Sequence, residues 1–147
     1  MFTFIVRGKP QSKLRARVVK NKYSGKVHGY TPEKTTNYEE LIRWSYIEAG
    51  GQYMGKNLIE AEIKAFYPIP KSTTKKQRLA IKQDEIRPQT KPDCDNIIKV
   101  VLDSLNGVAY YDDKQVVCVS CNKYYNDTGY LEITFKEFGE RNNGNQN

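Results

Sequence analysis

An apolar helix bracketed by aspartates, within residues 91–115, constrains the fold of this chain more than any other feature. Residues 95–106 place apolar side chains on one face at helical spacing, which predicts an amphipathic helix. A helix of this length is stable only when that face packs against another element. The apolar stripe consists of Ile97, Ile98, Val101, Leu102 and Leu105. Asn106 and Gly107 then predict a left-handed turn that ends the helix.

Strand patterns elsewhere supply the surface that this helix needs. Apolar and polar residues alternate in residues 2–7 and again in residues 59–65, and such alternation predicts half-buried strands. Residues 114–125 and 130–138 predict two further strands, and the Asn-Asp-Thr-Gly sequence between them predicts a hairpin. We therefore expect an α+β fold, mixed α/β in composition, in which helices pack on a small mixed β-sheet.

A helix and a second hairpin are predicted nearer the N-terminus. The Thr-Pro pair at 31–32 is typical of a helix start, and the Gly-Gly pair at 50–51 of a helix end. The helical spacing between them is carried by Tyr38, Leu41, Ile42 and either Ser45 or Tyr46. Before this helix, the Ser-Gly pair at 24–25 predicts a tight turn between two short strands.

Residues 73–85 predict a short and strongly basic helix. Ser72 and Thr73 are suited to cap its start, because their hydroxyl oxygens can accept bonds from free backbone N–H groups. Polar residues dominate the segment, so we expect a surface element, or a lid that becomes ordered on a ligand. The prolines of residues 86–92 then predict an extended linker.

The length of 147 residues suits one domain with a substantial hydrophobic core. We expect residues 1–140 to form this domain and the polar residues 141–147 to be disordered. No apolar run approaches the roughly 18 residues of a membrane span. The N-terminus also lacks the apolar core of a signal peptide. These features predict a cytoplasmic protein without membrane contact.

The cysteines indicate neither a disulfide framework nor a zinc site. Their number is odd, and a domain of this size needs no disulfide. Cys118 and Cys121 form a C-x-x-C pattern, but in a strand a separation of three places them on opposite faces. His28 is the only histidine, whereas a structural zinc site usually has four nitrogen or sulfur ligands.

The net charge of +7 is distributed in blocks. Residues 1–34 hold nine Lys or Arg residues and one acid, and residues 71–91 hold seven Lys or Arg residues and two acids. Residues 92–113 hold five aspartates and one lysine. Basic blocks attract polyanions, of which nucleic acid is the commonest. An acidic block beside them points to a site for a positively charged group.

The acidic block places four aspartates around the apolar helix. If Asp95 is the N-cap, its carboxylate lies at the positive end of the helix dipole. Lys99 follows one turn later on roughly the same face, and Asp93 lies just before the helix. A helix of about eleven residues is roughly 16 Å long, so a returning strand could bring Asp113 back beside its start.

Carboxylates that converge in this way repel each other unless a cation lies between them. Oxygen ligands without His or Cys select hard cations, Mg²⁺ first with Mn²⁺ as a substitute. A magnesium ion held by carboxylates keeps positions for water and phosphate, which predicts metal-assisted phosphodiester hydrolysis. Two alternatives stay open. The aspartates are caps and turn formers in a non-catalytic DNA-binding accessory protein, or the chain is a general Mg²⁺-dependent nuclease for branched DNA or flaps.

The same stretch resembles the signature of the RusA family of Holliday junction resolvases, endodeoxyribonucleases common in phages and prophages. The family pattern is D-x-D-N, an apolar residue and a Lys, followed by Asp-x-Leu-Asn-Gly and D-D-x-Q-V. This chain keeps these parts at residues 93–99, 103–107 and 112–116. FIVRGKPQSKLRAR and YTPEKTTNYEELI are also similar to the family, so the resemblance is nearly full length. One departure is Ala16, where a proline between two arginines is frequent.

The resemblance implies a homodimer that resolves four-way junction DNA by paired symmetric nicks in recombination and repair. It implies Mg²⁺ and no organic cofactor, and a phage or prophage gene in a bacterial host. Asp93, Asp95 and Asp113 match the family's metal-binding aspartates, and Lys99 its essential lysine, whereas Asp112 ranks below them. We expect DNA contacts from the two basic blocks, through Lys13, Arg15, Arg17, Lys20, Lys75, Lys76 and Arg78.

Overall fold

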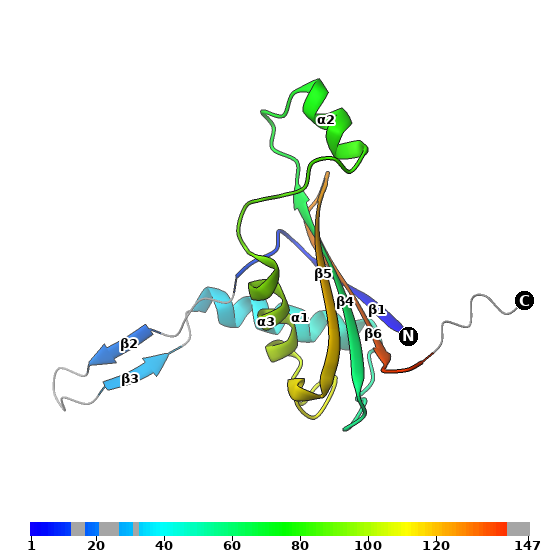
Figure 1. Ribbon diagram of the computed structural model, residues 1–147. Helices are drawn as coiled ribbons and strands as arrows, with labels where there is room; N and C mark the ends of the chain where they lie inside the picture. The colour runs from blue at the N-terminus through cyan, green and yellow to red at the C-terminus, as the bar shows by residue number, and fades with distance from the viewer. Residues whose placement is uncertain (13–16, 21–26, 31–32, 141–147) are drawn as a thin grey trace, which may run out of the picture.

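A computed structural model describes residues 1–12, 17–20, 27–30 and 33–140, with side chains for residues 1–12 and 37–140. The expected α+β class is confirmed, because the described residues form a four-stranded mixed sheet with helices packed on it (Figure 1). The strands of this sheet are β1 (Phe2–Arg7), β4 (Ile59–Pro68), β5 (Val116–Asn126) and β6 (Tyr130–Glu137). The helices are α1 (Glu33–Glu48), α2 (Lys75–Lys82) and α3 (Cys94–Ser104), with a short 3-10 helix, η1 (Asp113–Gln115).

The predicted hairpin between the last two strands is wrong. The strand order is β1-β6-β4-β5, so β4 lies between β5 and β6. β5 pairs in parallel with one edge of β4, and β6 pairs antiparallel with the other. The reason is the connection from β4 to β5, which passes through α2 and α3 and therefore returns the chain parallel to β4. β6 then reverses direction and occupies the edge of β4 that remains.

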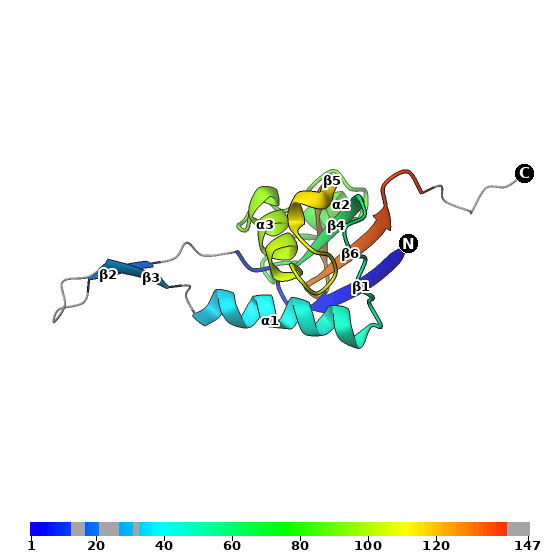
Figure 2. The same ribbon diagram turned by 90° about the horizontal axis from the view of Figure 1, so that it is seen from below.

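One face of the sheet carries the hydrophobic core, beneath α1 and α3 (Figure 2). The predicted alternation in β4 is confirmed, because its buried residues are Ile59, Ala61, Ile63, Ala65 and Tyr67. The apolar stripe of α3 is confirmed as well, with Ile98 half-buried and Ile97, Val101, Leu102 and Leu105 buried. Each such side chain contributes about 1.5–3 kcal/mol when it is fully buried. This packing fixes which face of α3 is left for solvent.

Helix α1 packs through a narrower stripe than the sequence suggested. Tyr38, Ile42 and Tyr46 are buried at a spacing of four residues. Leu41, which belongs to the same helical spacing in the sequence, is 41% exposed. The buried tyrosines lie on the face of α1 that packs against the sheet, and Leu41 lies beside that face. The predicted start of the helix at 31–32 lies outside the described residues.

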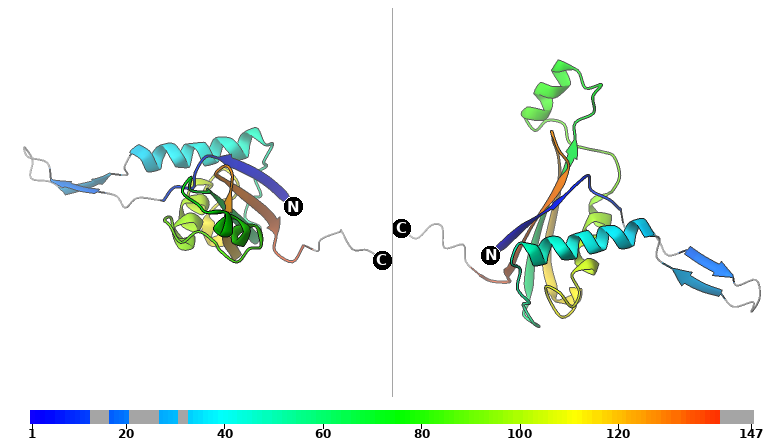
Figure 3. Two further views of the ribbon diagram at one scale, coloured as in Figure 1. Left: turned by 90° about the horizontal axis from the view of Figure 1, so that it is seen from above. Right: turned by 180° about the vertical axis from the view of Figure 1, so that it is seen from behind.

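The other face of the sheet carries no helix of the described residues (Figure 3). α2 stands beyond the C-terminal end of β4 and buries none of its residues, as expected for a surface element (Figure 1). Its cap is Thr74 rather than Ser72 or Thr73. The Thr74 hydroxyl accepts from Gln77 N, and the Gln77 side chain accepts from Thr74 N, at 3.2 and 2.9 Å. This reciprocal pair requires a glutamine three residues after the cap, which only Thr74 has.

The remaining expectations concern the basic N-terminal region and the tail. β2 (Arg17–Lys20) pairs antiparallel with β3 (Val27–Tyr30), so the two short strands are confirmed. Their predicted turn at 24–25 and the tail 141–147 lie outside the described residues. Within the described part of the chain, no helix is long and apolar enough to cross a membrane.

Candidate metal and catalytic site

The N-cap of helix α3 lies two residues earlier than the sequence suggested. Its N-cap is Asp93, which has an extended backbone (φ −72°, ψ 161°), and Asp95 lies in the first turn. The prediction of Asp95 as N-cap is therefore wrong, because Asp93, directly after Pro92, has that position and the helix begins at Cys94. The Asp93 carbonyl accepts the first helical bond from Ile97 N at 3.0 Å. The Asp93 side chain makes no capping hydrogen bond, so this exposed carboxylate is not used to complete the helix.

Three contacts fix the chain that leads into α3. The Tyr67 hydroxyl donates to Pro92 O at 2.7 Å, and Lys123 Nζ donates to Thr90 O at 2.6 Å. Cys94 Sγ donates to Cys121 O at 3.6 Å. Burial raises the pKa of Tyr67, so its hydroxyl stays protonated and remains a donor. The start of α3 is thus held against the ends of β4 and β5.

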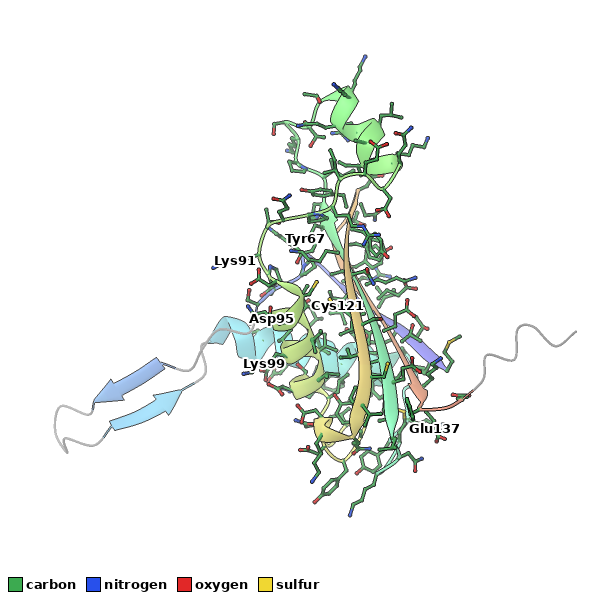
Figure 4. The ribbon with its side chains drawn as sticks, in the orientation of Figure 1. Tyr67, Lys91, Asp95, Lys99, Cys121 and Glu137 are labelled. Carbon is green, nitrogen blue, oxygen red and sulfur yellow. The ribbon has the colours of Figure 1, made fainter. Side chains whose placement is uncertain are left out.

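The outer face of α3 carries charged residues at intervals of four. Asp95, Lys99 and Asp103 follow each other one turn apart, which places them along the same side of the helix. Asp95 and Lys99 are exposed, and Figure 4 shows both on the side of α3 that faces away from β5. Lys91 reaches out from the linker on this side as well (Figure 4). Of the predicted site, Asp95 and Lys99 therefore share one side of α3, and Asp93 lies at the N-cap of the same helix.

A second acidic cluster lies at the other end of α3. The side chain of Asp113 lies next to that of Asp103. Burial raises the pKa of the Asp113 carboxyl, and the neighbouring Asp103 and Asp112 raise it further. Asp112 has a structural role: it caps η1 by accepting from Lys114 N at 3.0 Å. Neighbouring carboxylates repel each other when both are ionised, which favours a proton on one of them or a cation between them.

The structure does not bring Asp113 back beside Asp93 and Asp95. η1 follows directly after the turn at the end of α3, and β5 begins only after η1, so Asp113 stays at the C-terminal end of the helix (Figure 1). Asn106 fixes it there, because Asn106 Oδ1 accepts from Asp113 N at 2.7 Å. At 1.5 Å per residue, about 12 Å of helix separates Asp95 from Asp103, the partner of Asp113.

Within the described residues, no three His, Cys, Asp or Glu side chains lie close enough together to hold a metal ion. The donor chemistry at the start of α3 nevertheless fits a hard cation. Asp93 and Asp95 offer exposed carboxylates, of which Asp93 is free of capping. Magnesium is commonly held by one or two carboxylates, with water and substrate phosphate completing its ligands.

Sequence reasoning missed three residues that shape the C-terminal end of α3. Asp103 contacts Asp113, and Asn106 orients its backbone. Gln115 is buried and its side-chain amide donates to Gly55 O and Asn57 O, at 2.9 and 2.7 Å. Asp103 could have been found from its spacing of four residues after Lys99. Nothing in the sequence indicated that Gln115 anchors η1 to the loop before β4.

Only part of the predicted DNA-binding set can be placed. Lys75, Lys76 and Arg78 are exposed on α2. Lys13 and Arg15 lie outside the described residues. Arg17 and Lys20 belong to β2, but their side chains are not among those described.

Comparison with known proteins gives two matches. The sequence model of the family described as "Endodeoxyribonuclease RusA" matches residues 7–136. The chain is also 31% identical over 135 residues to the uncharacterized protein YqaN of Bacillus subtilis (strain 168), a match that covers 90% of this chain and 89% of that protein.

Proposed function

Because the chain belongs to the RusA family of endodeoxyribonucleases, we propose that it cuts DNA at the N-terminal end of α3. Membership makes it an endodeoxyribonuclease that hydrolyses phosphodiester bonds in Holliday junctions. The observation that supports this location is Asp93, an N-cap aspartate whose side chain makes no capping bond. Asp95 follows two residues later in the first turn of α3, so the start of the helix carries two exposed carboxylates that are available to a ligand.

The proposed cofactor is a divalent cation, Mg²⁺ with Mn²⁺ as a substitute, held by Asp93 and Asp95. When bound, such an ion lowers the pKa of a water molecule and neutralises charge that develops on the phosphate. Lys99, one turn farther along the same face, has the role of a cationic group that contacts the reacting phosphate. Its ammonium would stabilise the negative charge that is greatest in the transition state.

Asp113 is the proposed third carboxylate, and its position has a consequence for assembly. Within one chain it lies at the opposite end of α3 from Asp93. As a ligand of the same ion it would therefore be contributed by a second copy of the chain. A two-fold dimer is the commonest homo-oligomer. It would offer two equivalent sites to the two strands that a symmetric resolution cuts.

The proposed DNA contacts are basic residues of α2 and of the N-terminal region. Lys75, Lys76 and Arg78 are exposed on α2, and Lys13, Arg15, Arg17 and Lys20 belong to the basic N-terminal region. Phosphate contacts of this kind position the duplex arms without reading their sequence. We place this activity in the cytoplasm of a bacterial host and infer a phage or prophage origin for the gene.

The experiment compares a labelled four-way junction with a matched linear duplex, in Mg²⁺ and in chelator. We expect symmetric cuts in the junction with Mg²⁺ only, and none from Asp93→Asn or Asp95→Asn, although both variants still bind the junction. Glu48→Gln is the matched control, because it removes one exposed carboxylate at the end of α1 and should cut normally. Cutting by Asp93→Asn at the wild-type rate would remove Asp93 from the site. Equal cutting of duplex, flaps and junction would favour a general nuclease.

A further inference from the structure

A row of aromatic and basic side chains crosses the open face of the sheet. Arg7 of β1 pairs with Tyr130 of β6, Tyr130 with Phe66 of β4, and Phe66 with Tyr124 of β5. Arg7, Phe66 and Tyr130 each follow or precede a buried residue on their strand, so their side chains lie on the face without helices. Tyr124 lies on the same face, because its ring stacks on Phe66. One row of the sheet is therefore aromatic across three strands.

The rings of this row are stacked on one another. Phe66 lies 4.3 Å from Tyr130 and 5.4 Å from Tyr124 between ring centroids, with interplanar angles of 19° and 24°. The guanidinium of Arg87 lies over Tyr124, 4.5 Å from its centroid. A guanidinium therefore stands beside each end of the stack, Arg87 on Tyr124 and Arg7 next to Tyr130. The other rows of this face are mostly polar, for example Thr3, Thr134, Glu62 and Ser120.

The Tyr130 end of the stack opens into a pocket of about 500 Å³. Phe66 covers one face of the Tyr130 ring, so the other face is turned toward β1, where the pocket lies. Ile5 is 43% exposed here, and Arg7 has no ion pair with another described residue. The lining consists of Ile5, Arg7, Gly8, Thr128, Gly129 and Tyr130.

We propose that this pocket binds an unpaired nucleobase of branched DNA, stacked on Tyr130, with the adjoining phosphate on Arg7. An aromatic ring beside a guanidinium is the combination by which proteins hold single-stranded nucleic acid without reading its sequence. Ile5 supplies apolar contact for the base. This inference rests on the proposed function, and it adds a base-binding site on the face of the sheet opposite to α3.

The linker before α3 joins this row to the acidic end of the helix. On the open face, Arg87 contacts Tyr124 and donates to Asn122 Oδ1 at 3.2 Å. On the helix face, Thr90 accepts from Lys123. Residues 87–93 therefore pass around the edge of β5 from the aromatic row to Asp93. A DNA strand that follows this edge would connect the pocket with the site of cleavage.

The charge pattern favours DNA over a second protein chain as the occupant. The cores of protein interfaces are poor in charged residues. The row next to the aromatic one contains Glu132 and Lys64, and the aromatic row has a guanidinium at each end. Arg87 is already paired with Asp84, at 2.7 Å, whereas Arg7 has no such partner among the described residues. A free phosphate complements Arg7, and an apolar protein surface would leave it without a partner.

The test measures binding of a labelled oligothymidylate and of a matched duplex, in chelator so that no cutting occurs. Loss of one stacked base costs about 1–3 kcal/mol, so Tyr130→Ala should weaken oligothymidylate binding about 5- to 150-fold. Tyr130→Phe and Tyr130→Trp should bind normally, because the stacking surface remains. Tyr53→Ala is the matched control, since Tyr53 is 56% exposed and lies away from the row. Ile5→Glu, which leaves the stack intact, should also weaken binding.

The outcomes that overturn the proposal are distinct from failure of the nuclease. Binding of oligothymidylate by both Tyr130→Ala and Ile5→Glu at wild-type affinity would exclude the pocket. If Tyr130→Ala weakened the binding of duplex as much as the binding of oligothymidylate, the pocket would be a general phosphate contact instead of a base site. Dissociation of the oligomer by Tyr130→Ala would identify the face as a subunit contact. If the protein cuts junctions but gives any of these results, the proposed function stands and the base-binding site is rejected.

Discussion

At the scale of single residues, the aspartates around α3 divide into two kinds. Asp112 uses its carboxylate to cap η1, which is the ordinary use of such a residue. Asp93 stands at the N-cap of α3 and makes no such bond. The sequence showed only aspartates at both ends of a helix and could not separate caps from ligands. Hydrogen-bond partners separate them, because a carboxylate that already accepts a capping bond has less capacity for a cation.

Lys99 should affect turnover more than affinity. Its exposed ammonium lies one helical turn from Asp95, where it can meet charge that builds on a phosphate. Lys99→Ala should lower the single-turnover cutting rate of bound junction by roughly 10²-fold, a typical electrostatic contribution to a transition state. Lys99→Arg should retain part of the rate. A variant that cuts bound DNA normally but binds it weakly would make Lys99 an affinity residue.

Asp113 should make the stability of the protein depend on pH. Its carboxyl pKa is raised in the folded state, first by burial and then by Asp103 and Asp112, so the folded state binds this proton more tightly than the unfolded state. Stability therefore falls as the pH rises from the unfolded pKa of about 3.9 through the raised value. Asp113→Asn should raise the midpoint of thermal unfolding at pH 7, with a smaller gain at pH 3.

The measurement is thermal unfolding without metal, from pH 3 to pH 8, for the wild type and Asp113→Asn. Asp127→Asn is the control, since this exposed aspartate should shift the midpoint little at any pH. A midpoint for Asp113→Asn that is lower than the wild type at pH 7 would mean that the ionised carboxylate stabilises the fold.

At the scale of elements, the sequence predicted which segments are strands and helices better than how they pair. Period-two alternation in residues 59–65 and the stripe of α3 report burial directly, and both were confirmed. Pairing depends on where the chain returns after a crossover, which no local pattern records. The sequence at 126–129 favours a hairpin, yet β4 occupies the place beside β5 that a hairpin would need.

The same limit decided how much of the candidate site could be predicted. The position of Lys99 relative to Asp95, one turn along the same side, follows from helical spacing alone. The position of Asp113 depends on the turn between α3 and β5, which Asn106 and Gln115 fix through backbone contacts. Helical spacing therefore predicts how Asp95 and Lys99 lie relative to each other, whereas it does not predict where the chain places Asp113 after the turn.

At the scale of the whole molecule, one chain holds the proposed ligands at opposite ends of α3. A dimer in which two copies of α3 lie antiparallel would place Asp113 of each copy near Asp93 of the other. Sedimentation should then give about twice the chain mass of 17.0 kDa. A monomer that cuts both strands of a junction in one encounter would contradict this assembly.

Mixed dimers test whether the proposed site is shared between the copies. Homodimers of Asp93→Asn and of Asp113→Asn should both be inactive, because every site lacks one ligand. Consider a dimer of one Asp93→Asn chain with one Asp113→Asn chain. If each site takes Asp93 from one chain and Asp113 from the other, one site of this dimer lacks both aspartates and the other site has both. Such a dimer, purified through two different tags, should make single nicks in the junction. A dimer of one wild-type chain with one chain that carries both substitutions should be inactive, since each shared site then lacks a ligand. If each chain instead holds its own complete site, the two results are reversed. The dimer of the two single variants is then inactive, and the dimer with one wild-type chain makes single nicks. In that case Asp113 must reach Asp93 of the same chain by a rearrangement of the turn after α3.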